Sequence, residues 1–222
     1  MTKVKICGIK TYDDALAAAQ AGADMLGFNF FKRTPRYVDP EDALAICGRL
    51  RAEMGEATPM LVGLFVNEGV GRISMTLEKV GLRAAQLSGD ESVDLLKELR
   101  GIGFKAIRPR SKTEALEDAA YFLPHSPTEG AFPSLLLDAF SAGQYGGTGH
   151  QANIETVLAL KAVVPRLMVA GGLNPENVGD VVRTVQPWGV DVASGVEGDT
   201  PGLKDHGRVR AFIQAAKAAS EN

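Results

Sequence analysis

Short runs of apolar residues alternate with amphipathic segments along the whole chain, a pattern that is typical of βαβ units. The apolar runs predict strands at 4–7, 25–28, 60–66, 84–87, 104–107, 135–138, 167–172 and 190–195. The amphipathic segments predict helices at 12–21, 40–54, 73–80, 91–100, 113–122, 154–164 and 205–219, with a further helix starting at Asn174. About eight strands, each followed by a helix, predict an α/β fold in which residues 1–222 form a single-domain (β/α)8 TIM barrel with short loops.

The positions of the glycine clusters separate this barrel from an open, doubly wound sheet, the other fold built from βαβ units. A doubly wound sheet normally places its glycine-rich phosphate loop after the first strand, whereas only Gly8 follows the first predicted strand here. The clusters instead follow the late strands, at 146–149, 171–172 and 194–195. Barrels frequently bind phosphate through their late loops, so the sequence favours the barrel.

A carboxylate and a glycine-rich loop follow each other in the middle of the chain. The run 135–137 has the pattern of a strand buried on both faces, which places Asp138 at the carboxyl end, where parallel α/β folds carry their sites. The glycines of 146–149 leave backbone N–H groups free to converge on an anion. On this stretch alone, a turn-capping aspartate before an ordinary loop is an equally good interpretation.

Three loops together make a stronger case for an anion site than any one of them. Closing the barrel would bring the carboxyl ends of neighbouring late strands to one rim, and with them the N–H groups of their loops. We therefore expect these loops to bind a phosphate monoester. The residues concerned are Gly147, Thr148, Gly149, Gly171, Gly172, Ser194 and Gly195.

Composition and residue spacing argue against several classes of function. The chain of 222 residues is 45% hydrophobic but lacks the unbroken apolar run of roughly 18 residues that a membrane span needs. A strand is predicted almost from Met1, which leaves no room for a signal peptide, so we expect a cytoplasmic protein. The net charge is −3 and the basic residues are scattered, which argues against a nucleic-acid partner. Neither the cysteines nor the histidines have metal-site spacing, so we expect no metal.

Cys7 and Asp138 are the candidate acid–base pair. Side chains alternate along a strand, so Lys5 and Cys7 share one face. If that face is the barrel interior, Cys7 lies at the upper rim, across a bound substrate from Asp138, and such a pair suits proton transfer. The thiol would need a lowered pKa, which fixed N–H dipoles could supply. On sequence alone, an inert buried thiol is equally compatible.

Two further charged residues need partners in this arrangement. An interior Lys5 must be paired, and Asp191 on the adjoining last strand is the obvious candidate. Arg36 follows the second predicted strand, and its planar guanidinium suits a substrate carboxylate. The alternative for Arg36 is a local ion pair with Asp39 or Glu41.

Several motifs, in order along nearly the whole chain, resemble the phosphoribosylanthranilate isomerases of tryptophan biosynthesis. They are Lys5-Ile6-Cys7-Gly8, Gly27-Phe28, Thr34-Pro35-Arg36, Phe65-Val66-Asn67, Gln86-Leu87, Leu137-Asp138, Gly146-Gly147-Thr148-Gly149, Ala170-Gly171-Gly172-Leu173 and Ser194-Gly195-Val196-Glu197. The resemblance implies a cofactor-free Amadori rearrangement of N-(5-phosphoribosyl)anthranilate to 1-(2-carboxyphenylamino)-1-deoxyribulose 5-phosphate. It also implies that Cys7 is the general base, Asp138 the general acid and Arg36 the ligand of the anthranilate carboxylate. The expected partner is this small phosphorylated substrate, and the expected state is a monomer or homodimer.

One residue departs from the family pattern, and two other functions stay open. Ser88 stands where the family usually has histidine, so any substrate-orienting role at this position is in doubt. Another phosphosugar isomerase or epimerase on the same scaffold is possible, although the related barrels of histidine biosynthesis would put an aspartate at Cys7. A non-catalytic barrel that binds a phosphoribosyl ligand would keep the glycine loops but would not need an opposed thiol and carboxylate.

Overall fold

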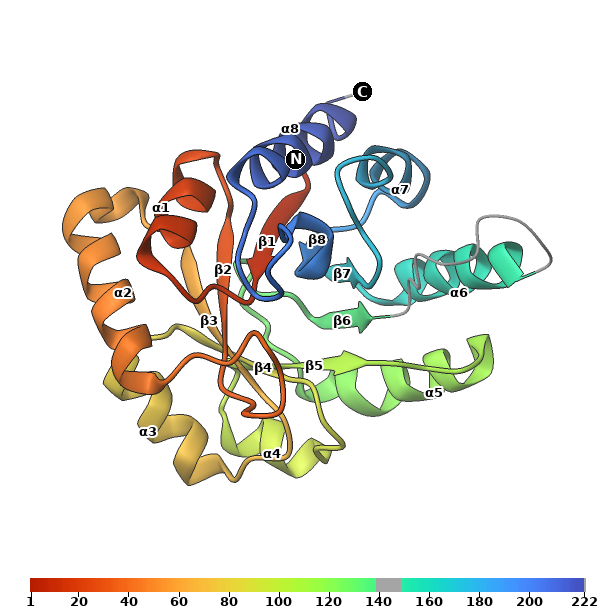
Figure 1. The fold of residues 1–222 in the computed structure, drawn as a ribbon. Helices are drawn as coiled ribbons and strands as arrows, with labels where there is room; N and C mark the ends of the chain where they lie inside the picture. Colours follow the sequence, from red (N-terminus) through yellow and green to blue (C-terminus); the bar gives the residue numbers. More distant parts are fainter. Residues whose placement is uncertain (139–148, 222) are drawn as a thin grey trace.

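In the computed structural model, which describes residues 1–138 and 149–221 and only the main chain of 149–153, the strands form a closed barrel inside a ring of helices (Figure 1). The strands are β1 (Lys3–Cys7), β2 (Met25–Asn29), β3 (Met60–Phe65), β4 (Ala84–Leu87), β5 (Gly103–Ile107), β6 (Leu135–Asp138), β7 (Leu167–Ala170) and β8 (Gly189–Val192). The α-helices are α1 (Tyr12–Gln20), α2 (Pro40–Met54), α3 (Val70–Val80), α4 (Val93–Glu98), α5 (Lys112–Phe122), α6 (Gly149–Val163), α7 (Val178–Val185) and α8 (His206–Ala219). Short 3₁₀ helices are η1 (Gly55–Ala57), η2 (Leu123–His125) and η3 (Ser194–Val196).

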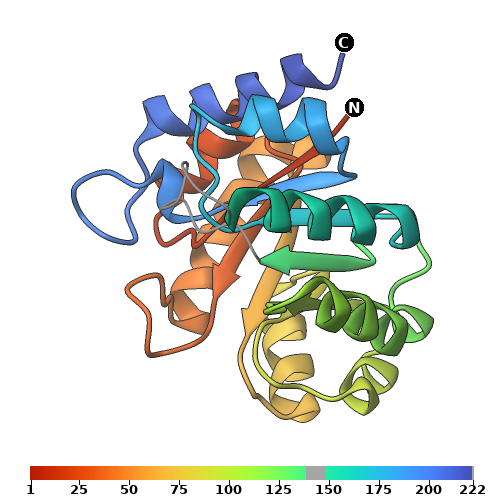
Figure 2. The same cartoon turned by 90° about the vertical axis from the view of Figure 1, so that its right-hand side faces the viewer.

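The strands are all parallel and follow one another around the barrel in chain order. β1 pairs with β2 on one side and with β8 on the other, which closes the sheet and leaves no edge. The view turned by 90° shows the helices outside the strands from a second direction (Figure 2). The predicted (β/α)8 barrel is confirmed, and the doubly wound alternative is wrong.

Alternation along the strands divides the apolar residues into two sets. The inner set fills the barrel and includes Met25, Phe104 and Leu136, whereas the larger outer set packs the strands against the helices. Leu135 and Leu137 belong to the outer set. Asp138 therefore has the inward parity of Leu136, at the carboxyl end of β6.

β1 follows the same rule and explains the position of the thiol. Val4 and Ile6 lie in the outer apolar set. Lys5 and Cys7 therefore point inward, as predicted, and Cys7 is the last residue of the strand. The Cys7 side chain consequently lies at the rim where the loops that follow the strands also gather.

Local sequence signals explain several helix ends. The Thr11 hydroxyl accepts a hydrogen bond from Asp14 N at 3.1 Å and begins α1, and Gly81 ends α3 with a φ of 74°. α7 starts at Val178 and not at Asn174, because the Asn174 side chain accepts hydrogen bonds from the main chain of the next turn. Within residues 1–138 and 149–221, no helix is long and apolar enough to cross a membrane.

Candidate active site

A pocket of about 390 Å³ opens at the carboxyl ends of the strands. It brings together most of the predicted site residues, which come from β1, β6 and the loops after β2, β7 and β8. Those that line it are Cys7, Arg36, Asp138, Gly171, Gly172, Ser194 and Gly195. Gly147 and Thr148 lie outside the described residues, and Gly149 is the first residue of α6.

Cys7 is buried at one wall of this pocket beside the ammonium group of Lys5. A methyl group built on Gly27 would lie 3.0 Å from Cys7 Sγ and 3.0 Å from Lys5 Nζ, so sulfur and nitrogen approach the same point. Burial raises the pKa of the Cys7 thiol, and the nearby Lys5 opposes this effect. The lowered pKa that a thiolate base would need is therefore not found in the free enzyme, because desolvation outweighs the nearby positive charge.

The predicted partner of Lys5 is confirmed. Lys5 Nζ donates to Asp191 Oδ1 at 2.9 Å, and both side chains are almost fully buried. The two residues are paired in the register of β1 with β8, so barrel closure itself brings them together. Burial alone would lower the pKa of Lys5, but the Asp191 carboxylate raises it above its ordinary value. Lys5 is therefore a fixed positive charge beneath the thiol.

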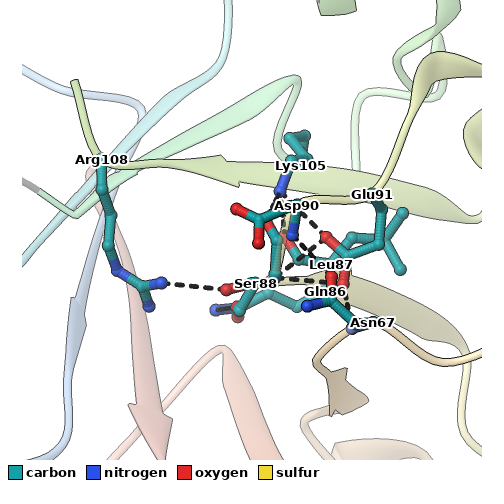
Figure 3. A network of polar contacts seen from close by, with 9 residues as sticks. Asn67, Gln86, Leu87, Ser88, Asp90, Glu91, Lys105 and Arg108 are labelled. Atoms are coloured by element: carbon teal, nitrogen blue, oxygen red, sulfur yellow. Dashed lines mark hydrogen bonds and ion pairs between the residues drawn. The ribbon is translucent and has the colours of Figure 1, made fainter.

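Asp138 carries an ion pair that the sequence did not reveal. Arg108, just beyond β5, donates from Nε to Asp138 Oδ2 at 2.8 Å. The same guanidinium donates from Nη1 to the main-chain oxygen of Ser88 at 2.9 Å (Figure 3). Arg108 thus connects the segments after β4 and β5 to the carboxylate at the end of β6. The only sequence signal for Arg108 was its position directly after a predicted strand, and a single arginine at such a position is too common to indicate a site residue.

Arg36 lines the pocket but pairs with a residue far away in the chain. Its Nε and Nη2 donate to the two Glu197 carboxylate oxygens at 2.6 and 2.9 Å. Lys204 Nζ lies 3.2 Å from Glu197 Oε1, and despite burial these two cations lower the pKa of the Glu197 carboxyl. The local alternative, pairing of Arg36 with Asp39 or Glu41, is not the pairing found.

Backbone conformation explains the late glycines. Gly171 and Gly172 have φ values of 89° and 61°, which favour glycine, and both follow β7. Gly195 lies in η3, the short helix after β8, where a methyl group would be 1.8 Å from the main-chain oxygen of Leu173. These segments meet at one side of the pocket with their backbone close to its interior, which is the arrangement that anion binding requires.

The described residues offer no obvious metal-binding site. Within them, no group of three or more His, Cys, Asp or Glu side chains is placed to hold a metal ion. Cys47, the other cysteine, lies on the buried face of α2, where burial raises the pKa of its thiol to about 12. The pocket can therefore supply a thiol, a carboxylate and cationic side chains to an organic ligand.

Comparisons with known proteins agree with this arrangement. The profile of the family described as N-(5'phosphoribosyl)anthranilate (PRA) isomerase matches residues 4–215. The N-(5'-phosphoribosyl)anthranilate isomerase of Trichlorobacter lovleyi is 42% identical over 99% of this chain and 100% of that protein. A structure of monomers of the dimeric phosphoribosylanthranilate isomerase of Thermotoga maritima is similar with a TM-score of 0.81, 34% identity, and coverage of 98% and 100%. A phosphoribosyl anthranilate isomerase in complex with reduced 1-(o-carboxyphenylamino)-1-deoxyribulose 5-phosphate has a TM-score of 0.80, 35% identity and the same coverage.

Proposed function

Because the chain belongs to the phosphoribosylanthranilate isomerase family, it is an isomerase of tryptophan biosynthesis, and we propose that Cys7 and Asp138 carry its chemistry. The reaction is the Amadori rearrangement of N-(5-phosphoribosyl)anthranilate to 1-(2-carboxyphenylamino)-1-deoxyribulose 5-phosphate. The observation that carries the assignment is the position of a thiol from β1 and a carboxylate from β6 on the wall of one pocket. Acid–base chemistry needs two such groups on either side of the reacting sugar.

The proposed sequence of steps uses each group once. Asp138, in its acid form, protonates the furanose ring oxygen; the bond from that oxygen to C1 breaks, and a protonated Schiff base forms. The Cys7 thiolate then removes the proton from C2, and the electron pair of that C–H bond moves to give the enolamine. Tautomerisation of the enolamine to the ketone gives the product. No electrons are exchanged with a second molecule, so the steps need only proton transfer.

We further propose that the charged ends of the substrate are held by different parts of the rim. Main-chain N–H groups around Gly171, Gly172 and η3 favour the 5-phosphate. Gly147, Thr148 and Gly149, which the sequence predicts to bind the same phosphate, belong to this proposal as well. Arg36 would bind the anthranilate carboxylate, for which its planar guanidinium is suited. Arg36 then has to exchange Glu197 for the substrate, or bind both with different N–H groups.

Substitution of the two proposed groups tests the assignment. We expect Cys7→Ala and Asp138→Ala each to lower turnover by at least ~10²-fold, because each removes one proton-transfer group. Binding of the reduced product analogue should persist, because the phosphate and carboxylate contacts are unchanged. Cys47→Ala is the control for loss of a thiol away from the pocket. Near-normal turnover in either pocket variant would remove the role assigned to that residue.

Two tests address the remaining expectations. Rescue of a tryptophan-requiring bacterial strain that lacks only this isomerase would separate the proposed substrate from other phosphosugars, and a non-catalytic ligand-binding barrel would give no rescue. The Thermotoga maritima relative is described as dimeric. For this chain we propose a monomer or homodimer, which light scattering on the purified protein would decide.

A further inference from the structure

Gln86 presents a buried hydrogen-bond acceptor without a partner to the pocket. It lies on β4 two residues after Ala84, whose side chain belongs to the inner apolar set, so it also points into the barrel. The residue is 4% exposed and lines the same pocket as Cys7 and Asp138. Gln86 Oε1 is the one buried side-chain polar atom in the described part of the chain that has no hydrogen-bond partner.

Ser88 binds the nitrogen end of the Gln86 amide. Gln86 Nε2 donates to Ser88 Oγ at 3.2 Å, so the amide nitrogen is engaged and the oxygen is directed away from it. Arg108 holds the main-chain oxygen of Ser88, and Figure 3 shows Gln86 and Ser88 beside each other with the Arg108 guanidinium aimed at Ser88. The serine that stands where the family usually has histidine is therefore the hydrogen-bond partner of this amide.

An unpaired buried acceptor is costly to keep, by about 1–3 kcal/mol. A structural role for Gln86 would not require this cost, because an apolar side chain of the same shape would fill the position without it. The acceptor is instead suited to a donor that arrives with the ligand. Both charged ends of the proposed substrate, the phosphate and the carboxylate, present acceptors and not donors. The donor must therefore belong to the central part of the substrate, which carries the anilino N–H and the sugar hydroxyls.

We propose that Gln86 Oε1 accepts a hydrogen bond from the reacting centre of the substrate, from either the anilino N–H or a sugar hydroxyl. This inference rests on the proposed function and names a further residue for it. The anilino nitrogen gains positive charge in the Schiff base, and the C2 hydroxyl becomes more acidic in the enolamine that precedes the ketone. A hydrogen bond from either donor strengthens as the reaction proceeds, so the bond contributes more to the transition state than to substrate binding.

The test is Gln86→Met, which keeps the volume and removes the acceptor. We expect kcat/KM to fall about 10- to 100-fold, mostly in kcat, as for loss of a hydrogen bond to a charged group. The melting temperature of the variant should not fall, because an unpaired buried acceptor has been removed. Gln20→Met, at the exposed end of α1, is the control for the same substitution away from the pocket. A variant with near-normal kcat/KM, or one that loses activity only in proportion to lost folded protein, would overturn the proposal.

Product analogues identify the donor. In one analogue an ether oxygen replaces the anilino nitrogen, and in others one sugar hydroxyl is absent. For the unsubstituted enzyme, the analogue that lacks the true donor should bind more weakly than the parent ligand. For Gln86→Met, that analogue and the parent ligand should bind with equal affinity. If Gln86→Met discriminates among all the analogues as the unsubstituted enzyme does, the proposed contact does not exist. Cys7→Ala is assayed in parallel. If Cys7→Ala is inactive and Gln86→Met has near-normal kcat/KM, only the role of Gln86 is rejected. If Cys7→Ala has near-normal kcat/KM, the proposed chemistry is rejected.

Discussion

Replacing Lys5 by methionine should destabilise the barrel strongly, because Asp191 would be left as a buried charge without a partner. The pair is separated by 2.9 Å, and the side chains of Lys5 and Asp191 are 0% and 8% exposed. Removing one member of such a pair typically costs about 3–5 kcal/mol. That is a large fraction of the roughly 5–15 kcal/mol by which a domain is stable. For a chain of this length, it corresponds to a fall in melting temperature of about 6–20 °C.

A double variant separates the charge from the loss of side-chain contacts. Lys5→Met combined with Asp191→Leu removes both charges, so we expect it to recover most of the lost stability. Thermal and urea unfolding of both variants at neutral pH provide the measurement. The raised pKa of Lys5 keeps it protonated there, and its contribution to stability is lost as the pH rises through that pKa. A single variant as stable as the unsubstituted protein, or a double variant no better than the single, would refute the reasoning.

The same double variant reports on the thiol. Burial and Asp191 disfavour the thiolate of Cys7. Lys5 and Lys204 favour it. Among the opposing charges Lys5 has the larger effect, so removal of both charges should move the pH midpoint for alkylation of the Cys7 thiol by iodoacetamide to higher pH. An unmoved midpoint would mean that Lys5 does not influence the Cys7 thiol.

Two further outcomes follow from the site. In a Cys47→Ala background, alkylation of the Cys7 thiol by iodoacetamide should accelerate with pH to a midpoint above that of an ordinary thiol, because burial raises the pKa of Cys7 and the thiolate is the reactive form; a midpoint at or below that of an ordinary thiol would contradict this. Gly195→Ala should raise KM at least ~10-fold, because the added methyl group would lie 1.8 Å from Leu173 O and must displace η3, which we propose to bind the substrate phosphate. The control is Gly71→Ala in α3, where a methyl group meets nothing within 4 Å, and it should leave stability unchanged or increase it. Equal KM values in the two variants would contradict the proposed role of η3 in phosphate binding.

The sequence predicted the parts of the fold that depend on local pattern. Buried strands such as 135–137 are continuous apolar runs, and Thr11 and Gly81 mark helix ends through their own capping groups. Predicted strands that ran into glycine pairs were too long: β7 ends at Ala170, because Gly171 turns the chain with a positive φ. Residue propensity indicates that the chain turns near these glycines, but it does not show at which residue the strand stops pairing with its neighbours.

The charged contacts of the site were less predictable. Lys5 and Asp191 could be paired in advance because barrel closure makes their strands neighbours. Arg36 and Glu197 are separated by 161 positions and lie in loops, whose paths follow from packing and not from periodicity. The Arg108 ion pair with Asp138 and the unpartnered Gln86 oxygen likewise depend on where individual side chains point, which no periodic pattern specifies.

The ion pair between Arg36 and Glu197 has a consequence for ligand selectivity. Under the proposed function, an incoming carboxylate has to compete with a bidentate carboxylate that is already in place, and Glu197 can fall back on Lys204 when Arg36 turns away. An uncharged aromatic amine offers nothing that could compensate for breaking that pair. The enzyme would thus bind neutral aryl glycosylamines weakly, because they cannot replace the ion pair of Arg36 with Glu197. No steric barrier against them is needed.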